Sequence, residues 1–192
     1  MVLRIAAIVV MALVVLTTPA SATYETGLYA YSAGDYDTAH SEWLPLAEAG
    51  DARSQYQLGQ MYLKGEGVEA DATMALKWFR LSADQGYSPS LVNLAALYYA
   101  GRGVAHDHDE AARLYGQAAR QGNPEAQYEL GVRYIHGDGV DKDLVRAHMW
   151  LSMAGMRGLN MASNRRDTIE AMMTAAQITE AERLREERMG SN

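Results

Sequence analysis

The amino-acid sequence predicts an all-α fold, a solenoid built from antiparallel pairs of helices. Three observations predict it: similar segments recur every 36 residues, apolar side chains within each segment are spaced as on one face of a helix, and a loop with two glycines divides each segment into halves. The composition agrees, because Ala, Leu, Met, Glu and Gln are common and only 4 of the 192 residues are proline. One pair of helices cannot bury such apolar faces alone, whereas a stack of pairs can.

Residues 1–22 have the pattern of a secretory signal peptide and are excluded from the fold prediction. Arg4 precedes a 12-residue apolar run from Ile5 to Leu16, and the TTPASA that follows supplies the small residues that a signal peptidase requires, which predicts cleavage after Ala22. We therefore expect a periplasmic or secreted protein. The alternative is that the segment stays uncleaved as a signal anchor, and this is the one way in which we expect the protein to contact a membrane.

The charge and the cysteine count exclude several classes of protein. The formal net charge is -7, and no cluster of Lys and Arg occurs beyond Arg165 and Arg166, whereas nucleic-acid binding depends on a basic surface. No nucleic-acid partner is therefore expected. Because the Cys count is 0, no disulfide framework can form, and the fold must depend on apolar packing.

The recurrence defines three full units, residues 52–87, 88–123 and 124–159. Residues 23–51 are expected to form a related N-terminal repeat, and residues 160–192 a C-terminal helical cap and tail. The three full units carry the same residue type at equivalent places: Leu58, Leu94 and Leu130; Tyr62, Tyr98 and Tyr134; Gly65, Gly101 and Gly137; Gly67, Gly103 and Gly139; Asp71, Asp107 and Asp143; Ala75, Ala111 and Ala147; Gly86, Gly122 and Gly158.

Each full unit is expected to hold two capped helices. Asp51 stands before the first helix of its unit, and the same capping role is assigned to Ser88 and Asn123 in the next two units. The glycines of the loops KGEGV, AGRGV and HGDGV are suited to ending a helix in the left-handed conformation, and Asp71 is a natural cap for the second helix. Small residues are expected where the two helices approach closely, on the first helix at Gly59, Ala95 and Gly131 and on the second at Ala75, Ala111 and Ala147.

These residues resemble those of a known family, the Sel-one-like repeat (SLR), a relative of the tetratricopeptide repeat (TPR). Its pattern is matched by SQYQLGQMYLKGEGVEADATMALKWFRLSADQG (54–86), by AQYELGVRYIHGDGVDKDLVRAHMWLSMAGMRG (126–158) and more weakly by residues 90–122. Residues 27–50 lack the second loop glycine and look more like a TPR unit. The resemblance implies a right-handed α-α superhelix of antiparallel helix pairs.

The C-terminal segment also fits the resemblance. Residues 165–187 resemble the helical tail that often closes bacterial members of the family. Thr174 and Gln177 are spaced as a capping box, in which each side chain bonds to the backbone N–H of the other residue.

If the array coils as its relatives do, the first helix of each unit lines the concave side. This predicts a partner-binding face with aromatic, aliphatic and scattered polar side chains, suited to an extended peptide or a helix of a partner protein. The alternative is that Tyr56, Val92 and Tyr128, which are equivalent in the three units, are packed in the core. The predicted face consists of Tyr31, Arg53, Tyr56, Gln60, Leu63, Lys64, Val92, Tyr99, Glu125, Tyr128, Val132 and Ile135.

No catalytic residue, metal site or cofactor is predicted. His106, Asp107, His108 and Asp109 could suggest a metal site, but Asp107 occupies the capping position, so a solvated loop is favoured. The paired glycines lack the preceding strand and the following G-K-[ST] of a phosphate-binding loop, and no motif such as G-x-S-x-G positions a Ser/His/Asp triad.

We therefore predict a non-catalytic exported scaffold that mediates protein–protein interaction in the bacterial envelope, as an adaptor or regulator. Its partner would be a protein or peptide of the cell envelope. The alternative is an envelope hydrolase or penicillin-binding (β-lactamase-like) activity, which has been linked to cysteine-rich secreted members of the family. The chain departs from those members because it lacks their regular cysteine pairs.

Overall fold

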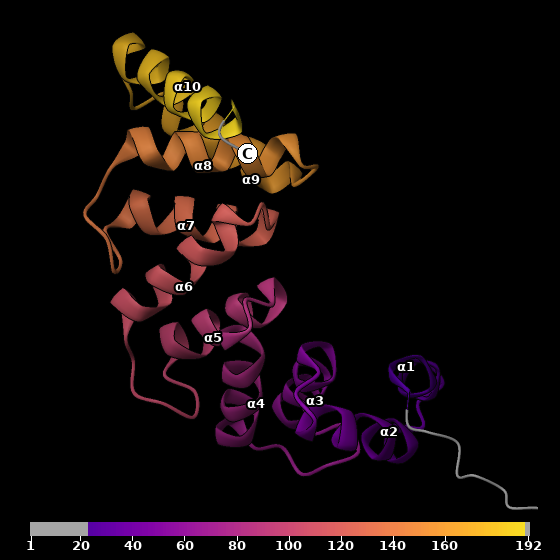
Figure 1. The fold of residues 1–192 in the computed structure, drawn as a ribbon. Coiled ribbons are helices and arrows are strands. Elements are labelled where there is room, and N and C mark those ends of the chain that lie inside the picture. Colours follow the sequence, from indigo (N-terminus) through magenta and orange to yellow (C-terminus); the bar gives the residue numbers. More distant parts are fainter. Residues whose placement is uncertain (1–22, 191–192) are drawn as a thin grey trace, which may run out of the picture.

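The computed structural model describes residues 23–190, which form a curved row of antiparallel helix pairs (Figure 1). The predicted signal peptide, residues 1–22, lies outside the described residues, as do residues 191–192. The described part contains helices and no strand. The helices are α1 (Tyr24–Ser32), α2 (Tyr36–Glu48), α3 (Ala52–Lys64), α4 (Ala72–Asp84), α5 (Ser88–Ala100), α6 (His108–Arg120), α7 (Pro124–His136), α8 (Leu144–Met156), α9 (Asn160–Glu170) and α10 (Ala175–Gly190).

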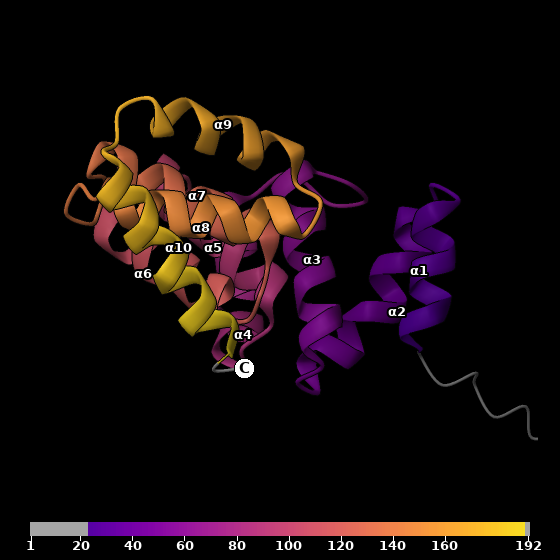
Figure 2. The same cartoon turned by 90° about the horizontal axis from the view of Figure 1, so that it is seen from above.

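Each helix packs against the helix before and after it in the chain, as expected for a stack of hairpins. The exception is the C-terminal end, where α9 and α10 both lie against α8 (Figure 2). In Figure 1, α1 and α3 lie nearer the inner side of the curve than α2 and α4. The predicted all-α solenoid is therefore confirmed. Within residues 23–190, no helix combines the length and the apolar character needed to span a bilayer.

The core runs along the whole row and has no single centre. The main cluster extends from α4 to α8 and includes the buried Phe79, Leu94 and Trp150. A second cluster joins α1, α2 and α3 around the fully buried Trp43, and a third joins α8 to α9 around Ile169. Each helix pair therefore depends on its neighbours for burial.

Bulky residues of the second helix pack onto small residues of the first. A Cβ atom added to Gly59 would lie 2.6 Å from the Phe79 ring, and one added to Gly131 would lie 2.8 Å from Leu151 Cγ. The close approach of the two helices was expected at Ala75 and Ala147 of the second helix. The glycines instead make room for Phe79 and Leu151, which lie one turn after those alanines. The missing side chain is what allows Phe79 and Leu151 to approach the facing helix this closely.

The second loop glycine of each unit has a role that the sequence did not indicate. Gly103 has a φ of +72° and lies against the first turn of α4, so an added Cβ would be 2.6 Å from the carbonyl carbon and oxygen of Ala72. Gly67 and Gly139 approach the first residues of α2 and α6, Tyr36 and His108, in the same way. The glycine loop therefore packs one unit onto the preceding one, besides turning the chain.

Most of the predicted helix caps are confirmed. Asp51 accepts a hydrogen bond from Ser54 N at 2.8 Å, and the Thr174 and Gln177 box is reciprocal, with bonds of 2.9 and 3.3 Å. The assignment of Ser88 is wrong, because the residue before α5 is Tyr87, which makes no side-chain cap. Ser88 instead begins the helix, and its hydroxyl is buried without a hydrogen-bond partner in the described part of the chain.

Candidate partner-binding face

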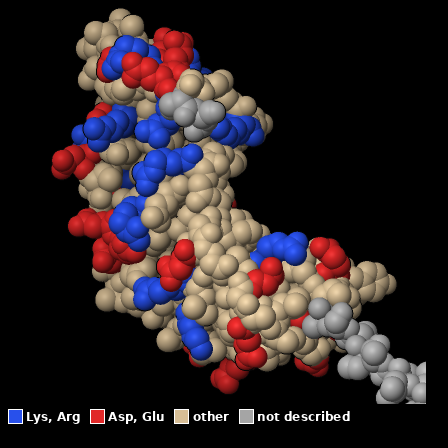
Figure 3. Space-filling view, viewed as in Figure 1, with Lys and Arg blue, Asp and Glu red and all other residues tan. Residues whose placement is uncertain are grey.

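The inner side of the curve is hollowed. Figure 3 shows a hollow between the α1–α3 end and the α8–α10 end, with a wall that is mostly neither acidic nor basic. The wall is formed by α1, α3, α5 and α7. Side chains from these helices reach across to the neighbouring odd-numbered helix, linking α1 with α3, α3 with α5 and α5 with α7.

Tyr24 of α1 is held between two side chains of α3. Gln57 Nε2 donates a hydrogen bond of 2.9 Å to the Tyr24 hydroxyl, and the guanidinium of Arg53 lies 4.1 Å from the centre of the Tyr24 ring. Arg53 also lies 3.8 Å from Glu25. Because cation and ring are both partly exposed, this arrangement orients the side chains more than it stabilises the fold.

A second contact between α1 and α3 involves Tyr31, Lys64 and Glu66. Lys64 Nζ donates a hydrogen bond of 3.1 Å to the Tyr31 hydroxyl, which itself donates to the carboxylate of Glu66. Partial burial and the bond to Glu66 raise the pKa of Tyr31, while Lys64 lowers it. The same contact raises the pKa of Lys64. The phenol stays protonated at neutral pH and keeps its role as donor.

The contact between α3 and α5 depends on an amide pair. Gln60 Nε2 donates to the Tyr56 hydroxyl at 3.0 Å and to Asn93 Oδ1 at 3.3 Å. The Tyr56 ring also meets the Tyr87 ring edge-on, with centroids 5.5 Å apart. Two of these side chains therefore present amide groups beside aromatic rings, a mixture typical of surfaces that bind a peptide backbone.

Between α5 and α7 the contact is charged. The Arg133 guanidinium lies 3.8 Å from the centre of the Tyr99 ring, and its Nη2 lies 3.2 Å from Glu129 Oε2. Burial raises the pKa of Glu129, although Arg133 lowers it and Glu125 raises it further. Arg133 Nε and Nη1 are buried without a partner among the described residues.

The structure separates the predicted residues into groups. Arg53, Lys64 and Glu125 are exposed, and the remaining aromatic, aliphatic and amide residues are half-buried, except for the two valines. Val92 and Val132 are 6% and 8% exposed, so they belong to the core and are removed from the candidate face. Tyr128 and Ile135 are partly covered by the cluster formed with α8 and α9.

The prediction missed several residues that build the face. Gln57, Asn93 and Glu129 are equivalent in the three full units and are polar in each, a signal that was available in the sequence. Arg133 gave no such signal, because its equivalents Met61 and Leu97 are buried apolar residues. Its position beside Tyr99 could be found only from the packing of α5 against α7.

One group of residues resembles a hydrolytic triad in composition. His148 Nε2 lies 2.7 Å from Glu170 Oε1, and Ser152 Oγ lies 3.4 Å from His148 Nδ1. The serine is only 1% exposed and the histidine 2% exposed. The hydroxyl therefore cannot meet a substrate in this arrangement, and the contact with Glu170 instead joins α8 to α9.

The histidines near α6 also form local contacts. His106 Nδ1 lies 2.8 Å from the backbone carbonyl of Tyr99, and the His108 ring stacks on the Tyr99 ring at 4.8 Å. Asp107 caps α6 through Glu110 N at 2.9 Å. Among residues 23–190, no three His, Asp or Glu side chains are grouped so that they could hold a metal ion.

Comparison with known proteins identifies the repeat. The family model described as Sel1 repeat matches residues 52–87, 88–123 and 124–159, more than half of the chain. The chain belongs to the Sel1 repeat family. The predicted resemblance to Sel-one-like repeats is thus confirmed. The Sel1 repeat fold generally mediates protein–protein interaction, and the family is typically non-catalytic.

Two curated relatives share short segments with this Sel1 repeat protein. An uncharacterised protein of Neisseria meningitidis is 37% identical over 56 residues, which cover 29% of this chain and 12% of that protein. A sel1-like repeat-containing protein of Acanthamoeba polyphaga mimivirus is 41% identical over 46 residues, covering 24% of this chain and 8% of the viral protein. The chain therefore spans a small part of the length of these relatives.

Two solved structures are similar over most of the chain. A protective antigen of uropathogenic Escherichia coli strains, which displays an SLR fold, has a TM-score of 0.72 at 32% identity and covers 76% of this chain and 32% of the antigen. A Sel1 repeat protein from Oxalobacter formigenes has a TM-score of 0.74 at 28% identity, covering 77% of this chain and 60% of that protein. Both likenesses support the solenoid fold.

Proposed function

We propose that this Sel1 repeat protein is a non-catalytic scaffold, an adaptor or regulator in the bacterial envelope, that binds an extended segment of an envelope protein along its inner face. The observation that supports the proposal is the series of half-buried aromatic and amide side chains already linked from helix to helix. Gln57 bonds to Tyr24 and Gln60 bonds to Asn93, each across 33 positions of sequence.

Such links matter for affinity because binding must otherwise order flexible side chains. Immobilising one side chain costs about 0.5–1.5 kcal/mol on association. Side chains that are already held by a neighbouring helix lose less freedom, so more of the contact energy contributes to binding. The amide groups of Gln and Asn can also donate to and accept from the backbone of an extended peptide.

The envelope location rests on residues 1–22, whose sequence has the pattern of a cleaved signal. Cell fractionation followed by N-terminal sequencing of the mature protein tests it. A mature protein that begins at Thr23 in the periplasm or medium is expected. A chain that keeps residues 1–22 and stays in the cytoplasm would contradict the proposed location.

Filling the hollow tests the binding face without removing any contact of the fold. Ala96 is exposed on α5, one turn after Asn93, so Ala96→Arg places a long side chain over the middle of the inner face. Ala176 is exposed on α10 and provides a matched control, Ala176→Arg. Both variants should fold as the parent protein does, which circular dichroism can verify.

Mild crosslinking in intact cells, followed by mass spectrometry, measures partner capture. We expect one or a few envelope proteins to be captured by the parent and by Ala176→Arg, and to be strongly reduced with Ala96→Arg. Equal capture by both variants would show that the partner does not use the inner face. If the parent protein captured no envelope protein above background, the proposed function itself would be contradicted.

A further inference from the structure

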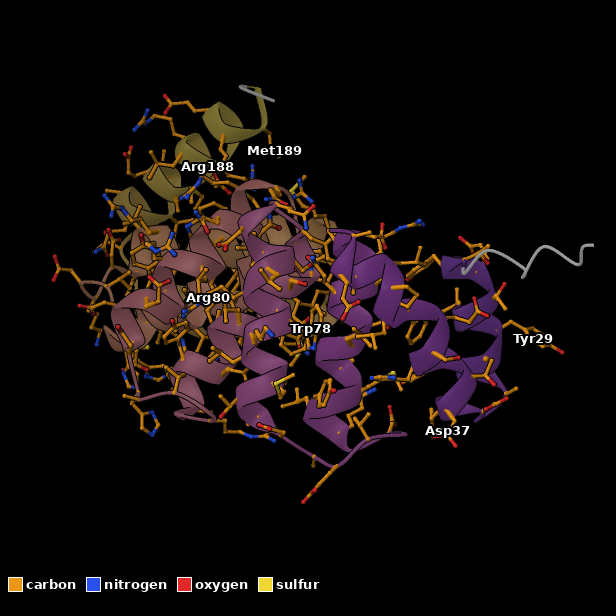
Figure 4. All side chains as sticks on the ribbon, turned by 60° about the horizontal axis from the view of Figure 1, so that its bottom comes forward. Tyr29, Asp37, Trp78, Arg80, Arg188 and Met189 are labelled. Atoms are coloured by element: carbon orange, nitrogen blue, oxygen red, sulfur yellow. The ribbon has the colours of Figure 1, made fainter. Side chains whose placement is uncertain are left out.

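A cleft of about 570 Å³ opens between α6, α8 and α10, on the outer side of the array. Its lining includes Leu130, Met149 and Trp150, which are buried side chains of the main core cluster. Figure 4 places Arg188, which also lines the cleft, on α10 at the end of the array remote from Tyr29. The cleft is thus separate from the inner face, and its lining combines an apolar floor with a charged rim.

The rim is strongly basic. The lining contains Arg113 and Arg120 from α6, Arg146 from α8 and Arg188 from α10, against a single acidic residue, Asp109. The whole chain has a formal net charge of -7, so this concentration of cations is not an average property of the surface. Figure 3 shows Lys and Arg side chains over this part of the molecule, with Asp and Glu side chains among them. A concave surface lined by one sign of charge attracts ligands of the opposite sign.

Two of the guanidiniums lie near aromatic rings. Arg188 lies 4.6 Å from the centre of the Trp150 ring, and Arg146 lies 5.7 Å from that of Tyr134. Arg146 Nε also lies 3.4 Å from Asp143, the cap of α8. The Nη donors of Arg146 lie in the plane of its guanidinium, where a carboxylate or phosphate can accept two hydrogen bonds at once.

The two arginines of α6 differ in their partners. Arg113 makes two hydrogen bonds of 2.6 Å with Glu110. Arg120 forms no ion pair with an acidic side chain of residues 23–190, and one of its terminal nitrogens would lie 3.5 Å from a Cβ added to Gly116. Gly116 therefore leaves room for the Arg120 side chain beside the cleft, and Arg120 keeps its hydrogen-bonding capacity for a ligand.

We propose that this cleft binds a small organic oxyanion, a carboxylate or phosphate group attached to an apolar body. Arg120 and Arg146 bind the oxyanion, and Leu130, Met149 and Trp150 contact the apolar part. A volume of about 570 Å³ lies within the range of small-molecule sites, about 300–1,000 Å³. The proposal does not rest on the inner face and stands whether or not a protein partner binds there.

Three probes test the chemistry in a titration of the full chain followed by NMR of the arginine Nε–H and tryptophan indole signals. The probes are phenyl phosphate, phthalate and inorganic phosphate. Phenyl phosphate or phthalate should bind about tenfold more tightly than inorganic phosphate, because only the first two can contact the apolar floor. Tighter binding of phenyl phosphate would assign a phosphate ligand, and tighter binding of phthalate would assign a carboxylate.

A charge-matched pair of double variants tests the site. Arg120→Gln with Arg146→Gln removes two cations of the rim. Arg102→Gln with Arg165→Gln removes two exposed cations elsewhere and changes the net charge by the same amount. The first pair should weaken the organic probe about tenfold or more, and the second should leave its Kd within about twofold, because only the first removes direct hydrogen bonds to the anion.

Filling the floor tests the cleft without altering charge. Gly116→Met places a flexible apolar side chain into the lining, and it should abolish the preference for the organic probes over inorganic phosphate. Thermal unfolding verifies that each variant is folded. Equal weakening by the two charge variants, equal binding of all three probes to the parent protein, or no binding at about 10 mM probe would each overturn the proposal.

Discussion

Gly103→Ala tests the role of the glycine loop in joining one unit to the preceding one. The added Cβ would lie 2.6 Å from the Ala72 carbonyl group and 2.9 Å from Thr73 N. This part of α4 cannot move easily, because Asp71 accepts hydrogen bonds from Thr73 N and Met74 N at 2.8 and 3.0 Å. The methyl group must therefore displace the loop or separate the two units.

The expected loss has two parts. A non-glycine residue in the left-handed conformation costs about 1–2 kcal/mol. Forcing one extra methyl group into a closely packed contact costs about 1–3 kcal/mol more. The free energy of unfolding should therefore fall by about 2–5 kcal/mol for Gly103→Ala.

Gly34→Ala isolates the first part. Gly34 has a φ of +80°, and a Cβ added there would meet no atom within 4 Å, so only the backbone strain remains. Urea unfolding followed by far-ultraviolet circular dichroism measures both variants, with the slope of the transition checked because repeat arrays can lose cooperativity. Equal losses for the two variants would show that the contact between loop and helix adds nothing to stability, and would refute the reasoning.

Three further changes have defined outcomes. Phe79→Ala should lower the free energy of unfolding by about 3–5 kcal/mol, because the ring is fully buried against Gly59 and its removal leaves a cavity. Asp71→Ala should cost about 1 kcal/mol, because it removes the acceptor that caps α4. Burial raises the pKa of Glu129 in the folded protein above its ordinary value of 4.5, so folding favours the protonated carboxyl. The free energy of unfolding should therefore decline as the pH rises from that ordinary value through the folded-state pKa. Glu129→Gln should therefore be as stable as the parent protein near pH 3, where the parent carboxyl is protonated in both the folded and the unfolded state. It should be at least as stable as the parent near pH 7, about where the parent carboxylate is charged in both states.

The first two of these predictions have control variants, and the third has an outcome that would contradict it. Leu81→Ala, at a side chain that is 40% exposed on α4, should cost much less than Phe79→Ala, and equal losses would contradict the assignment of Phe79 to the core. Asp84→Ala removes an exposed carboxylate from the last residue of α4, away from the capped first turn, and should cost less than Asp71→Ala. A Glu129→Gln variant that is clearly less stable than the parent near neutral pH would contradict the sign of the pKa shift.

The helix pairs, their loops and most caps could be predicted because they depend on short stretches of chain. A cap such as Asp51 bonds to a backbone N–H three residues away, and a glycine that ends a helix acts on its own turn. The error at Ser88 arose from a shift of one residue in the equivalent position: Tyr87 precedes α5, and no side-chain hydrogen bond caps this helix. Even a regular repeat therefore does not preserve every local contact.

The candidate face was less predictable, since exposure depends on how one pair rotates on the next. Helical spacing placed Val92 and Val132 on the inner side, but the neighbouring helices cover them and leave 6% and 8% of each exposed. Conversely, Arg133 occupies a position that is apolar in the other units, yet its guanidinium lies 3.8 Å from Tyr99. Spacing along one helix predicts which way a side chain points, but not how far the neighbouring helices cover it.

The sequence by itself determined the all-α architecture, the 36-residue unit and most of the helix caps, because turns, caps and apolar periodicity act within a few residues. Only the tertiary structure decided which side chains meet across units, such as Gln60 with Asn93 at a separation of 33 residues. It also decided that α10 folds back along α8 and forms one side of the arginine-lined cleft. These contacts depend on the angle between successive helix pairs, which is set by the packing of all their facing side chains together.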